Sequence, residues 1–306
     1  MRHLRIILSI TIVTLMFFTN LGFTQDKPEK LMPSGDVVFV NLKMQYPMVQ
    51  RILDKKTKLE LEDIILEVNS MTKKHRYDLN DLSELYKKQR EKVLVTYKRD
   101  NKVQQEVLTS DDFRSVYLTS VQQFFGTITA IKENGEFIAM SHNIEGGEVA
   151  SSSEVYDTSY VHSEKATLFK SGGLVPHTKL DKIGYIKQYG EYGVKGVLSS
   201  NRFDEKKSVE IAKPKEGVAH IYCKSPITNE MKMHEIEITK VYKNMSKIKV
   251  KDEELKKYRG GVIGGMSGSP VIQDGKIIGG IRSSIIFNHK IGFISNIHAM
   301  LSVEGE

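Results

Sequence analysis

Residues 260–272, with the sequence GGVIGGMSGSPVI, form the stretch of this chain that could carry out chemistry. Five glycines and a proline stand among apolar β-branched residues, so the backbone must turn tightly between two strands. A serine at such a turn can expose its hydroxyl while neighbouring N–H groups converge, as the oxyanion of an acyl-transfer reaction requires. Ser267 is therefore a candidate nucleophile. A glycine-rich hairpin with incidental serines is the alternative, and Ser269 before Pro270 fits a structural turn.

A serine nucleophile needs a general base and a group that orients this base. His142 follows an apolar strand predicted over residues 136–140, although a histidine there is also typical of a satisfied core or rim position. Asp252 lies fifteen positions before Ser267 at a strand-to-loop junction, where it would equally cap a helix over residues 253–257. The residue types alone leave both interpretations open.

The composition excludes some other functions. The 45 Lys and Arg against 38 Asp and Glu give a net charge of +7, spread in mixed runs. Without a dense basic block with interleaved aromatics, nucleic-acid binding is not expected, and a solvated mixed-charge surface is favoured over attraction to an anionic membrane. The single cysteine, Cys223, excludes an intramolecular disulfide and a Cys-rich zinc site, and its context predicts an ordinary strand thiol. No metal or other cofactor is expected.

The elements that position these residues are predicted to be mostly β. From residue 124 onward, short apolar runs are broken by Gly, Asn and Ser, as in a barrel or sandwich. Asn134-Gly135 and Asp274-Gly275 have the composition of hairpin turns. The predicted strands cover residues 126–131, 136–140, 193–198, 217–223, 234–241, 247–250, 269–273 and 276–281.

A small α+β module is predicted over residues 36–110. It contains strands at 36–42 and 61–68, a helix at 78–90 begun by Asp78, and a hairpin of 93–97 with 103–108. Residues 62–69, EDIILEVN, resemble a strand of PDZ domains, although the glycine before the acidic residue and a clear carboxylate-binding loop are missing. This resemblance implies a PDZ-like domain.

The first residues have the features of a targeting segment. Residues 1–25 combine a positive start with a short apolar run, as in a signal peptide or an N-terminal membrane anchor. A polar linker is expected over residues 26–35. Either form of the segment implies that the remaining chain is exported across the cytoplasmic membrane.

The whole constellation resembles the peptidase family of the stage IV sporulation protein B (SpoIVB). The family signature GGIVQGMSGSPIIQNGK is matched here by GGVIGGMSGSPVIQDGK at residues 260–276. The family's histidine segment, A-L-G-H-x-I, is matched by AMSHNI at 139–144, and its aspartate lies fifteen residues before the serine, as Asp252 does. Ser141 replaces the family's glycine before the histidine, and Glu253 replaces a proline after the aspartate.

This resemblance implies a chymotrypsin-like double β-barrel peptidase domain over residues 111–306, preceded by the PDZ-like domain. It also implies a serine endopeptidase in which Ser267 attacks a peptide carbonyl, His142 transfers the proton and Asp252 orients the imidazolium. The N–H groups of Gly265 and Ser267 would then form the oxyanion hole.

The partners implied by the resemblance are protein or peptide substrates. The family trims its own N-terminal region, here expected within residues 25–35, and cuts a membrane-associated regulatory protein in sporulation signalling. Two alternatives remain at this stage: an envelope protease unrelated to sporulation, and a catalytically silent PDZ-containing scaffold.

Overall fold

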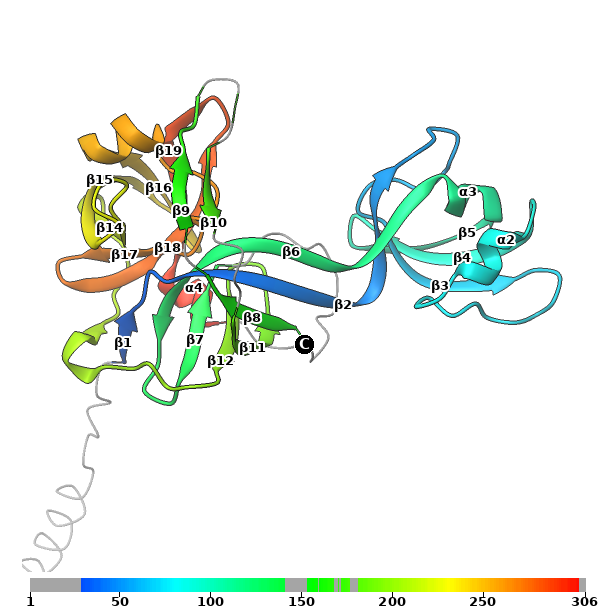
Figure 1. Cartoon of the computed structure of the whole chain (residues 1–306), viewed down its shortest axis with the longest axis horizontal. Coiled ribbons are helices and arrows are strands. Elements are labelled where there is room, and N and C mark those ends of the chain that lie inside the picture. Colours follow the sequence, from blue (N-terminus) through cyan, green and yellow to red (C-terminus); the bar gives the residue numbers. More distant parts are fainter. Residues whose placement is uncertain are drawn as a thin grey trace, which may run out of the picture.

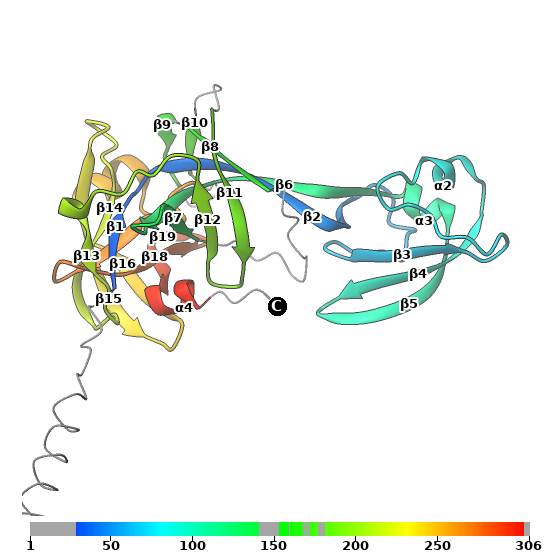
Figure 2. The ribbon, with the colours of Figure 1, turned by 90° about the horizontal axis from the view of Figure 1, so that it is seen from below.

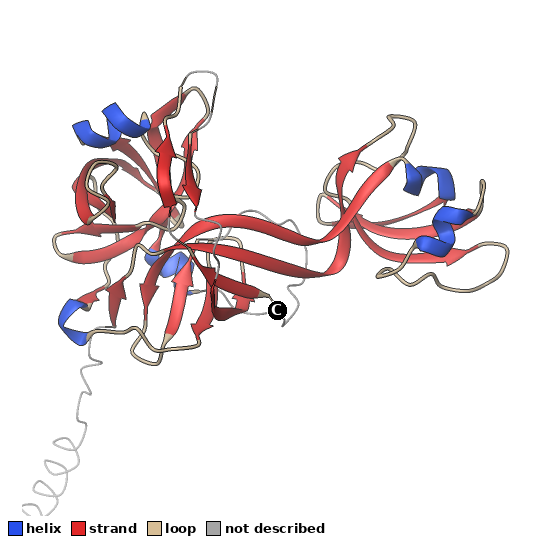
Figure 3. Cartoon of the chain, viewed as in Figure 1, coloured by secondary structure: helices blue, strands red, loops and turns tan. Residues whose placement is uncertain are grey.

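The computed structural model describes residues 29–140, 153–158, 160–167, 170, 172–176 and 181–302. The expected targeting segment, most of the expected linker and His142 lie outside these residues. The described chain forms two adjacent β-barrels and, beyond a long ribbon, a separate lobe (Figures 1 and 2). Strands dominate all three parts, as the sequence predicts (Figure 3).

The first barrel is a closed antiparallel sheet of six strands around an apolar core that includes Val38, Ile128, Phe137 and Val155. The pairing of β2 with β6 closes it. In their order around the barrel, the strands are β2 (Val37–Ile52), β6 (Val116–Ile131), β7 (Glu136–Ala139), β12 (Val194–Leu198), β11 (Asp181–Tyr189) and β8 (Glu154–Asp157).

The second barrel is also closed and has six antiparallel strands. Its core is built largely from inward-facing Ile and Val side chains, to which each of the six strands contributes. Asp274 and Gly275 both have positive φ and join β17 to β18, as the hairpin prediction expects. Around the barrel the strands are β14 (Gly217–Lys224), β15 (Met231–Val241), β16 (Met245–Val250), β19 (Asn288–Asn296), β18 (Lys276–Ile285) and β17 (Pro270–Gln273).

A shared apolar cluster joins the two barrels. Ala130 and Ile138 from the first barrel pack with Ile272 and Ile277 from the second, and Met300 of the C-terminal helix α4 (Ile297–Leu301) completes the contact. Burial of this cluster fixes the barrels relative to each other, which an active site at their junction requires. The smaller elements of this half are the hairpin β9 (Tyr160–Glu164) and β10 (Gly173–Pro176), η1 (Glu205–Lys207), β13 (Val209–Glu210) and the π-helix η2 (Leu255–Arg259).

The α+β lobe is an insertion into the first barrel and does not precede it. β2 and β6 pair from Val37 opposite Thr127 to Ile52 opposite Val116, with register shifts between Lys43 and Met48 and between Val49 and Arg51, so both strands leave the barrel and enter the lobe (Figure 1). The first seven residues of β2, Val37 to Lys43, fall within the range 36–110 that was expected to form the α+β module, but they pair with β6 in the first barrel. An alternating strand pattern cannot tell which sheet its far end joins.

Within the lobe, a sheet packs on two short helices around a core of Val68, Leu85, Phe113 and their neighbours. The predicted hairpin is confirmed, with Asp100 and Asn101 both at positive φ in its turn. The helix expected over residues 78–90 is only five residues long, because the Asp78 carboxylate holds the N–H of Asn80 in a turn before it. The elements are β3 (Ile64–Ser70), α2 (Ser83–Lys87), β4 (Lys92–Arg99), β5 (Lys102–Thr109) and α3 (Ser110–Arg114).

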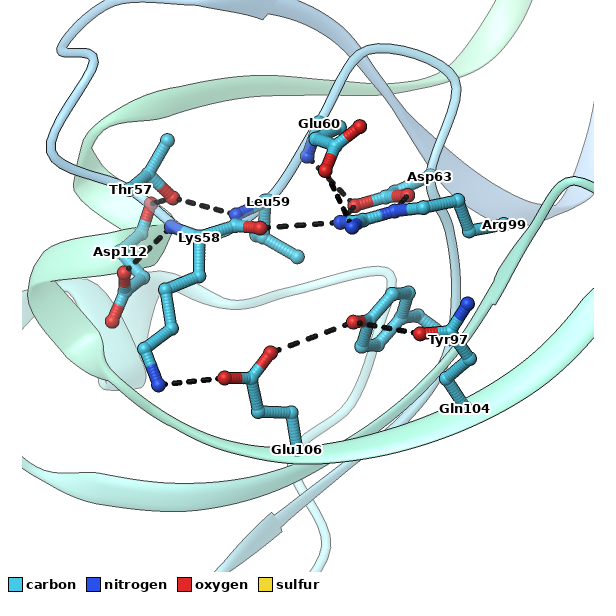
Figure 4. A network of polar contacts seen from close by, with 10 residues as sticks. All are labelled: Thr57, Lys58, Leu59, Glu60, Asp63, Tyr97, Arg99, Gln104, Glu106 and Asp112. Carbon is cyan, nitrogen blue, oxygen red and sulfur yellow. Dashed lines mark hydrogen bonds and ion pairs between the residues drawn. The ribbon is translucent and has the colours of Figure 1, made fainter.

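The acidic residue of the PDZ-like segment has a structural role. Asp63 is fully buried and accepts two 2.7 Å hydrogen bonds from Nε and Nη2 of Arg99, as Figure 4 shows. This bidentate pair raises the pKa of Arg99. Glu62 just before it adopts φ 71°, a left-handed conformation that the missing glycine would adopt at lower cost.

Replacing Asp63 with Asn should lower the free energy of unfolding of the lobe by about 3 kcal/mol, because Arg99, whose side chain is 20% exposed, loses its fully buried carboxylate partner. Urea unfolding followed by circular dichroism would measure this. Glu60→Gln is the matched control, since Glu60 contacts the same Arg99 but its side chain is 65% exposed; it should change stability by less than about 1 kcal/mol. Equal effects of the two substitutions would contradict the role given to Asp63.

The N-terminal end of the described chain is part of the sheet. β1 (Lys30–Pro33) pairs with both β6 and β13, and Leu31 is fully buried. The N–H groups of Ser34 and Gly35 continue this pairing to Thr129 and Ile128. The linker expected over residues 26–35 therefore ends before Lys30. No helix in the described ranges is long and apolar enough to span a membrane.

Candidate active site

The loop that carries Ser267 leaves the second barrel and is held by the first. The N–H of Thr127 on β6 donates to the Ser267 carbonyl at 2.7 Å, and the Thr127 hydroxyl donates to the Gly265 carbonyl at 2.8 Å. Two residues further along β6, the Thr129 hydroxyl donates to the carbonyl of Gly268 at 2.6 Å. The predicted nucleophile thus lies at the junction of the two barrels, with its backbone fixed from both sides.

Glycine is required at the closest approach of the barrels. Gly268 has φ 94°, and a Cβ on it would lie 1.9 Å from the Thr127 carbonyl oxygen. No side chain fits this space, so the glycine that follows Ser267 is required by the packing of the loop against β6. The Ser267 hydroxyl lies 3.3 Å from the Arg282 carbonyl of β18, to which it donates.

The two N–H groups predicted to form the oxyanion hole make no hydrogen bond within the described residues. Among the described residues, no hydrogen bond uses the N–H of Gly265 or the N–H of Ser267, whereas Met266 between them donates to Ile263. Two N–H groups flanking a partly exposed serine hydroxyl are the donors that an oxyanion requires. The role of both N–H groups as oxyanion donors stays a prediction.

Gly265→Ala should lower kcat by about 10²–10³-fold, because Gly265 has φ 84° and a new Cβ would lie 3.0 Å from Cβ of Leu174 on β10. The strain would turn the Gly265 N–H away from the oxyanion. Steady-state hydrolysis of a peptide substrate would measure the loss. Gly275→Ala is the control: it has φ 73° but open space around it, so it should cost stability and leave kcat unchanged.

The competing hydroxyl is not accessible. Ser269 is only 1% exposed, and its N–H and carbonyl are used by Met266 and Ile281. A substrate carbonyl cannot reach this buried side chain. The structural turn role predicted for Ser269 fits this position.

Asp252 lies at the end of β16 and contacts a histidine other than the one expected. Its Oδ1 accepts the N–H of Leu255 at 2.8 Å, so it caps the helical segment that begins at Glu253 and continues as η2, as the alternative interpretation held. The same oxygen lies 3.1 Å from Nδ1 of His234, without the alignment of a hydrogen bond. The structure joins Asp252 to His234, while His142 lies outside the described residues.

His234 was missed by the sequence reasoning, although a signal exists. On β15 it alternates with Ile236 and Ile238, and all three are buried in the second barrel. This period of two places His234 on the inward face. Burial lowers its pKa, against the opposing effect of the carboxylates of Asp252 and Glu254.

The buried neutral His234 should make the protein less stable in mild acid. Its folded pKa is below its unfolded value of about 6.5, so only the unfolded state gains a proton as the pH falls below that value. This stability is present at neutral pH and is lost, at up to about 1.4 kcal/mol per pH unit, until the folded pKa is reached. Urea unfolding of wild type and His234→Gln at pH 7.5 and 5.5 should show a smaller loss in the variant; equal losses would contradict this.

A buried arginine, Arg259, contacts the loop that carries Ser267. Arg259 donates from Nη2 to the Lys224 carbonyl at 2.8 Å, and its Nη1 lies 3.6 Å from the sulfurs of Cys223 and Met266. Met266 immediately precedes the nucleophile. Cys223 lies on β14, as the strand-thiol prediction expects, and burial raises its pKa to about 11, so it is a protonated, unreactive thiol at neutral pH.

Comparison with known proteins agrees with the motif. A family model described as SpoIVB peptidase S55 matches residues 114–301. Solved structures with a similar fold include the active form of the Rv3671c protease of M. tuberculosis, 14% identical, with a TM-score of 0.37 over 60% of this chain and 73% of that one. A serine endoprotease of Yersinia pestis is 12% identical, with a TM-score of 0.37 over 59% of this chain and 56% of that chain. No curated protein sequence matches this chain.

Proposed function

Because the chain belongs to the SpoIVB peptidase S55 family and is a serine peptidase of chymotrypsin-like fold, we propose that it is an exported endopeptidase acting through Ser267. The Ser267 hydroxyl attacks a peptide carbonyl, and the developing oxyanion binds the N–H groups of Gly265 and Ser267. His142 takes the serine proton and gives it to the leaving amine. Water, which loses a proton to His142, then attacks the acyl-enzyme. His142 returns this proton to the Ser267 oxygen as the acyl group leaves.

The observation that carries this proposal is the state of the nucleophile loop. The Ser267 hydroxyl is partly exposed, and the two flanking N–H groups make no other hydrogen bond among the described residues. Threonines of β6 and the buried Arg259 hold this arrangement before substrate binds. Preorganised donors of this kind stabilise the transition state because they need no rearrangement.

Asp252 receives a different proposed role from the one that the family resemblance implies. Its carboxylate is engaged by the Leu255 N–H and lies against His234, inside the second barrel. We assign Asp252 a structural role, in which its carboxylate fixes the start of η2 and the position of the buried His234. It would then act on catalysis through the loop and not through the proton relay.

Self-processing, if the chain follows the family pattern, is placed upstream of β1. A scissile bond must be accessible and extended in the active site, and residues 30–35 are paired into the sheet. We therefore propose a self-cleavage site before Lys30. Beyond itself, the proposed substrate is an envelope or membrane-associated regulatory protein, which serves sporulation signalling if the organism forms spores.

The test uses the full chain as wild type and as Ser267→Ala. Both are incubated for hours and followed by intact mass, with and without a serine-directed phosphonate. Without the phosphonate, the wild type should shorten at a site before Lys30. With the phosphonate, it should gain the mass of one phosphonate group. The Ser267→Ala variant should show neither change. If neither protein reacts with the probe nor cleaves a peptide library, the silent-scaffold alternative is favoured.

A further inference from the structure

The turn between β18 and β19 exposes an unusual apolar tip. Ile286 is 69% exposed and Phe287 is 65% exposed, and Ile285 before them is partly exposed as well. The hairpin reaches the upper edge of the second barrel in Figure 1. These three consecutive large apolar side chains bury little surface in the folded chain, so a polar turn would stabilise the fold as well.

The backbone of the turn supports a purpose other than stability. Phe287 adopts φ 71°, a left-handed conformation that Gly or Asn adopts readily and that is costly for a bulky aromatic residue. The chain thus holds an aromatic side chain in solvent at a strained position. Such strain is a reason to look for a ligand of the side chain.

Basic side chains surround the tip. A cavity of about 300 Å³ beside Phe287 has Lys165, Lys256, His289 and Lys290 in its wall. Among the described residues that line it, none is acidic. Lys256 has an acidic partner, Glu253, whose side chain is 88% exposed and does not line the cavity. Positive charge from three separate chain segments therefore converges on one apolar protrusion.

We propose that this tip, Ile285 to Phe287 with the cavity of Lys165, Lys256 and Lys290, docks the peptidase on an anionic lipid surface. Apolar side chains that enter the acyl region and lysines that meet lipid phosphates are the two contributions that give stable interfacial binding. The tip combines exposed apolar side chains with neighbouring lysines, which is the combination that an anionic lipid surface binds. Complementary charge selects anionic over neutral lipid.

Docking at this site would also place the nucleophile. The Ser267 hydroxyl contacts the carbonyl of Arg282, which lies on β18 three residues before Ile285 of the tip, roughly 10 Å along the strand. A peptidase held by this tip would meet segments of chain close to a membrane surface. This inference does not depend on peptidase activity, and its test does not measure activity.

The test exploits the absence of tryptophan from the chain. Phe287→Trp supplies a single fluorophore at the tip, and Tyr242→Trp supplies the control. Tyr242 is an exposed aromatic residue beside Lys240 and Lys243 in the β15–β16 turn. This turn lies at the opposite end of β19, because Met245 pairs with Ser295. Both full-length variants are mixed with phosphatidylglycerol or phosphatidylcholine vesicles, with and without brominated lipid.

We expect a blue-shifted emission and quenching by brominated lipid for Phe287→Trp with phosphatidylglycerol only, reduced in high salt. Tyr242→Trp should show neither, even if the N-terminal segment brings the chain to the vesicle. The absence of a shift at position 287, or an equal shift with neutral vesicles, would overturn the proposal. Free inorganic phosphate should not reproduce the shift, which separates lipid from a soluble anion.

Charge reversals give a second measurement. Lys165→Glu with Lys290→Glu should weaken binding to phosphatidylglycerol vesicles by at least about 25-fold, at roughly fivefold for each lysine lost. Lys240→Glu with Lys243→Glu makes the same change of net charge at the opposite turn and should have little effect. Phe287→Asn, which suits the left-handed turn, should keep the fold and lose binding. Equal effects of the two double variants would show that only overall charge matters.

Discussion

Ser267→Ala is expected to lower kcat/KM for peptide hydrolysis by about 10⁴-fold or more, because the acyl-enzyme can no longer form. Any residual rate would come from the two N–H donors and from substrate binding. The loop should keep its geometry, since Thr127 and Thr129 hold backbone carbonyls of the loop and not the Ser267 side chain. Hydrolysis of a peptide found by library screening, with the thermal midpoint as a check of folding, would measure the effect.

Ser269→Ala is the matched control for this substitution. It removes a hydroxyl of the same motif, two residues away, that is 1% exposed. It should keep kcat/KM within about tenfold of the wild type, since only packing is disturbed. If Ser269→Ala were as inactive as Ser267→Ala, or if Ser267→Ala stayed active, the assignment of the nucleophile would be wrong.

The second large effect is expected from His142→Ala, which should lower kcat by about 10⁴-fold at unchanged stability. Without the base, the hydroxyl of Ser267 cannot lose its proton as it attacks. The loss should be the same when Ser267 is also replaced, because serine and histidine act as one unit and their effects do not add. Rates of the single and double variants would measure this. Full hydrolysis by His142→Ala would contradict the whole mechanism.

Asp252→Asn and His234→Gln, compared with His142→Ala, separate a relay role from a supporting role. The contact of Asp252 with His234 predicts that both substitutions lower the free energy of unfolding, by about 1–3 kcal/mol, and reduce activity in parallel. A loss of about 10⁴-fold for Asp252→Asn alone, with stability unchanged, would instead place Asp252 in the relay that the family resemblance implies.

The sequence by itself determined the features that depend on local residue order. The glycines, Ser267 and Pro270 stand in one short motif, so the tight turn, the nucleophile and the oxyanion donors could be read together. Hairpin turns such as Asp274-Gly275 follow from the φ preferences of neighbouring residues. The strand before this turn was predicted within one residue of its observed bounds, whereas the strand after it runs four residues beyond its predicted end. The family also follows from this motif, because its length exceeds chance.

Tertiary structure alone decided which distant segments meet. The apolar run in residues 36–42 predicted a strand, but its register with Thr127 made it part of the barrel and turned the α+β module into an insertion. The contact of Asp252 with His234, a residue 18 positions away along the chain, also depends on the fold of β15 and not on neighbouring residues. The expected helix at 78–90 shortened because side-chain turns competed with it. Pairing across long stretches of sequence depends on register and packing, which no window of neighbouring residues contains.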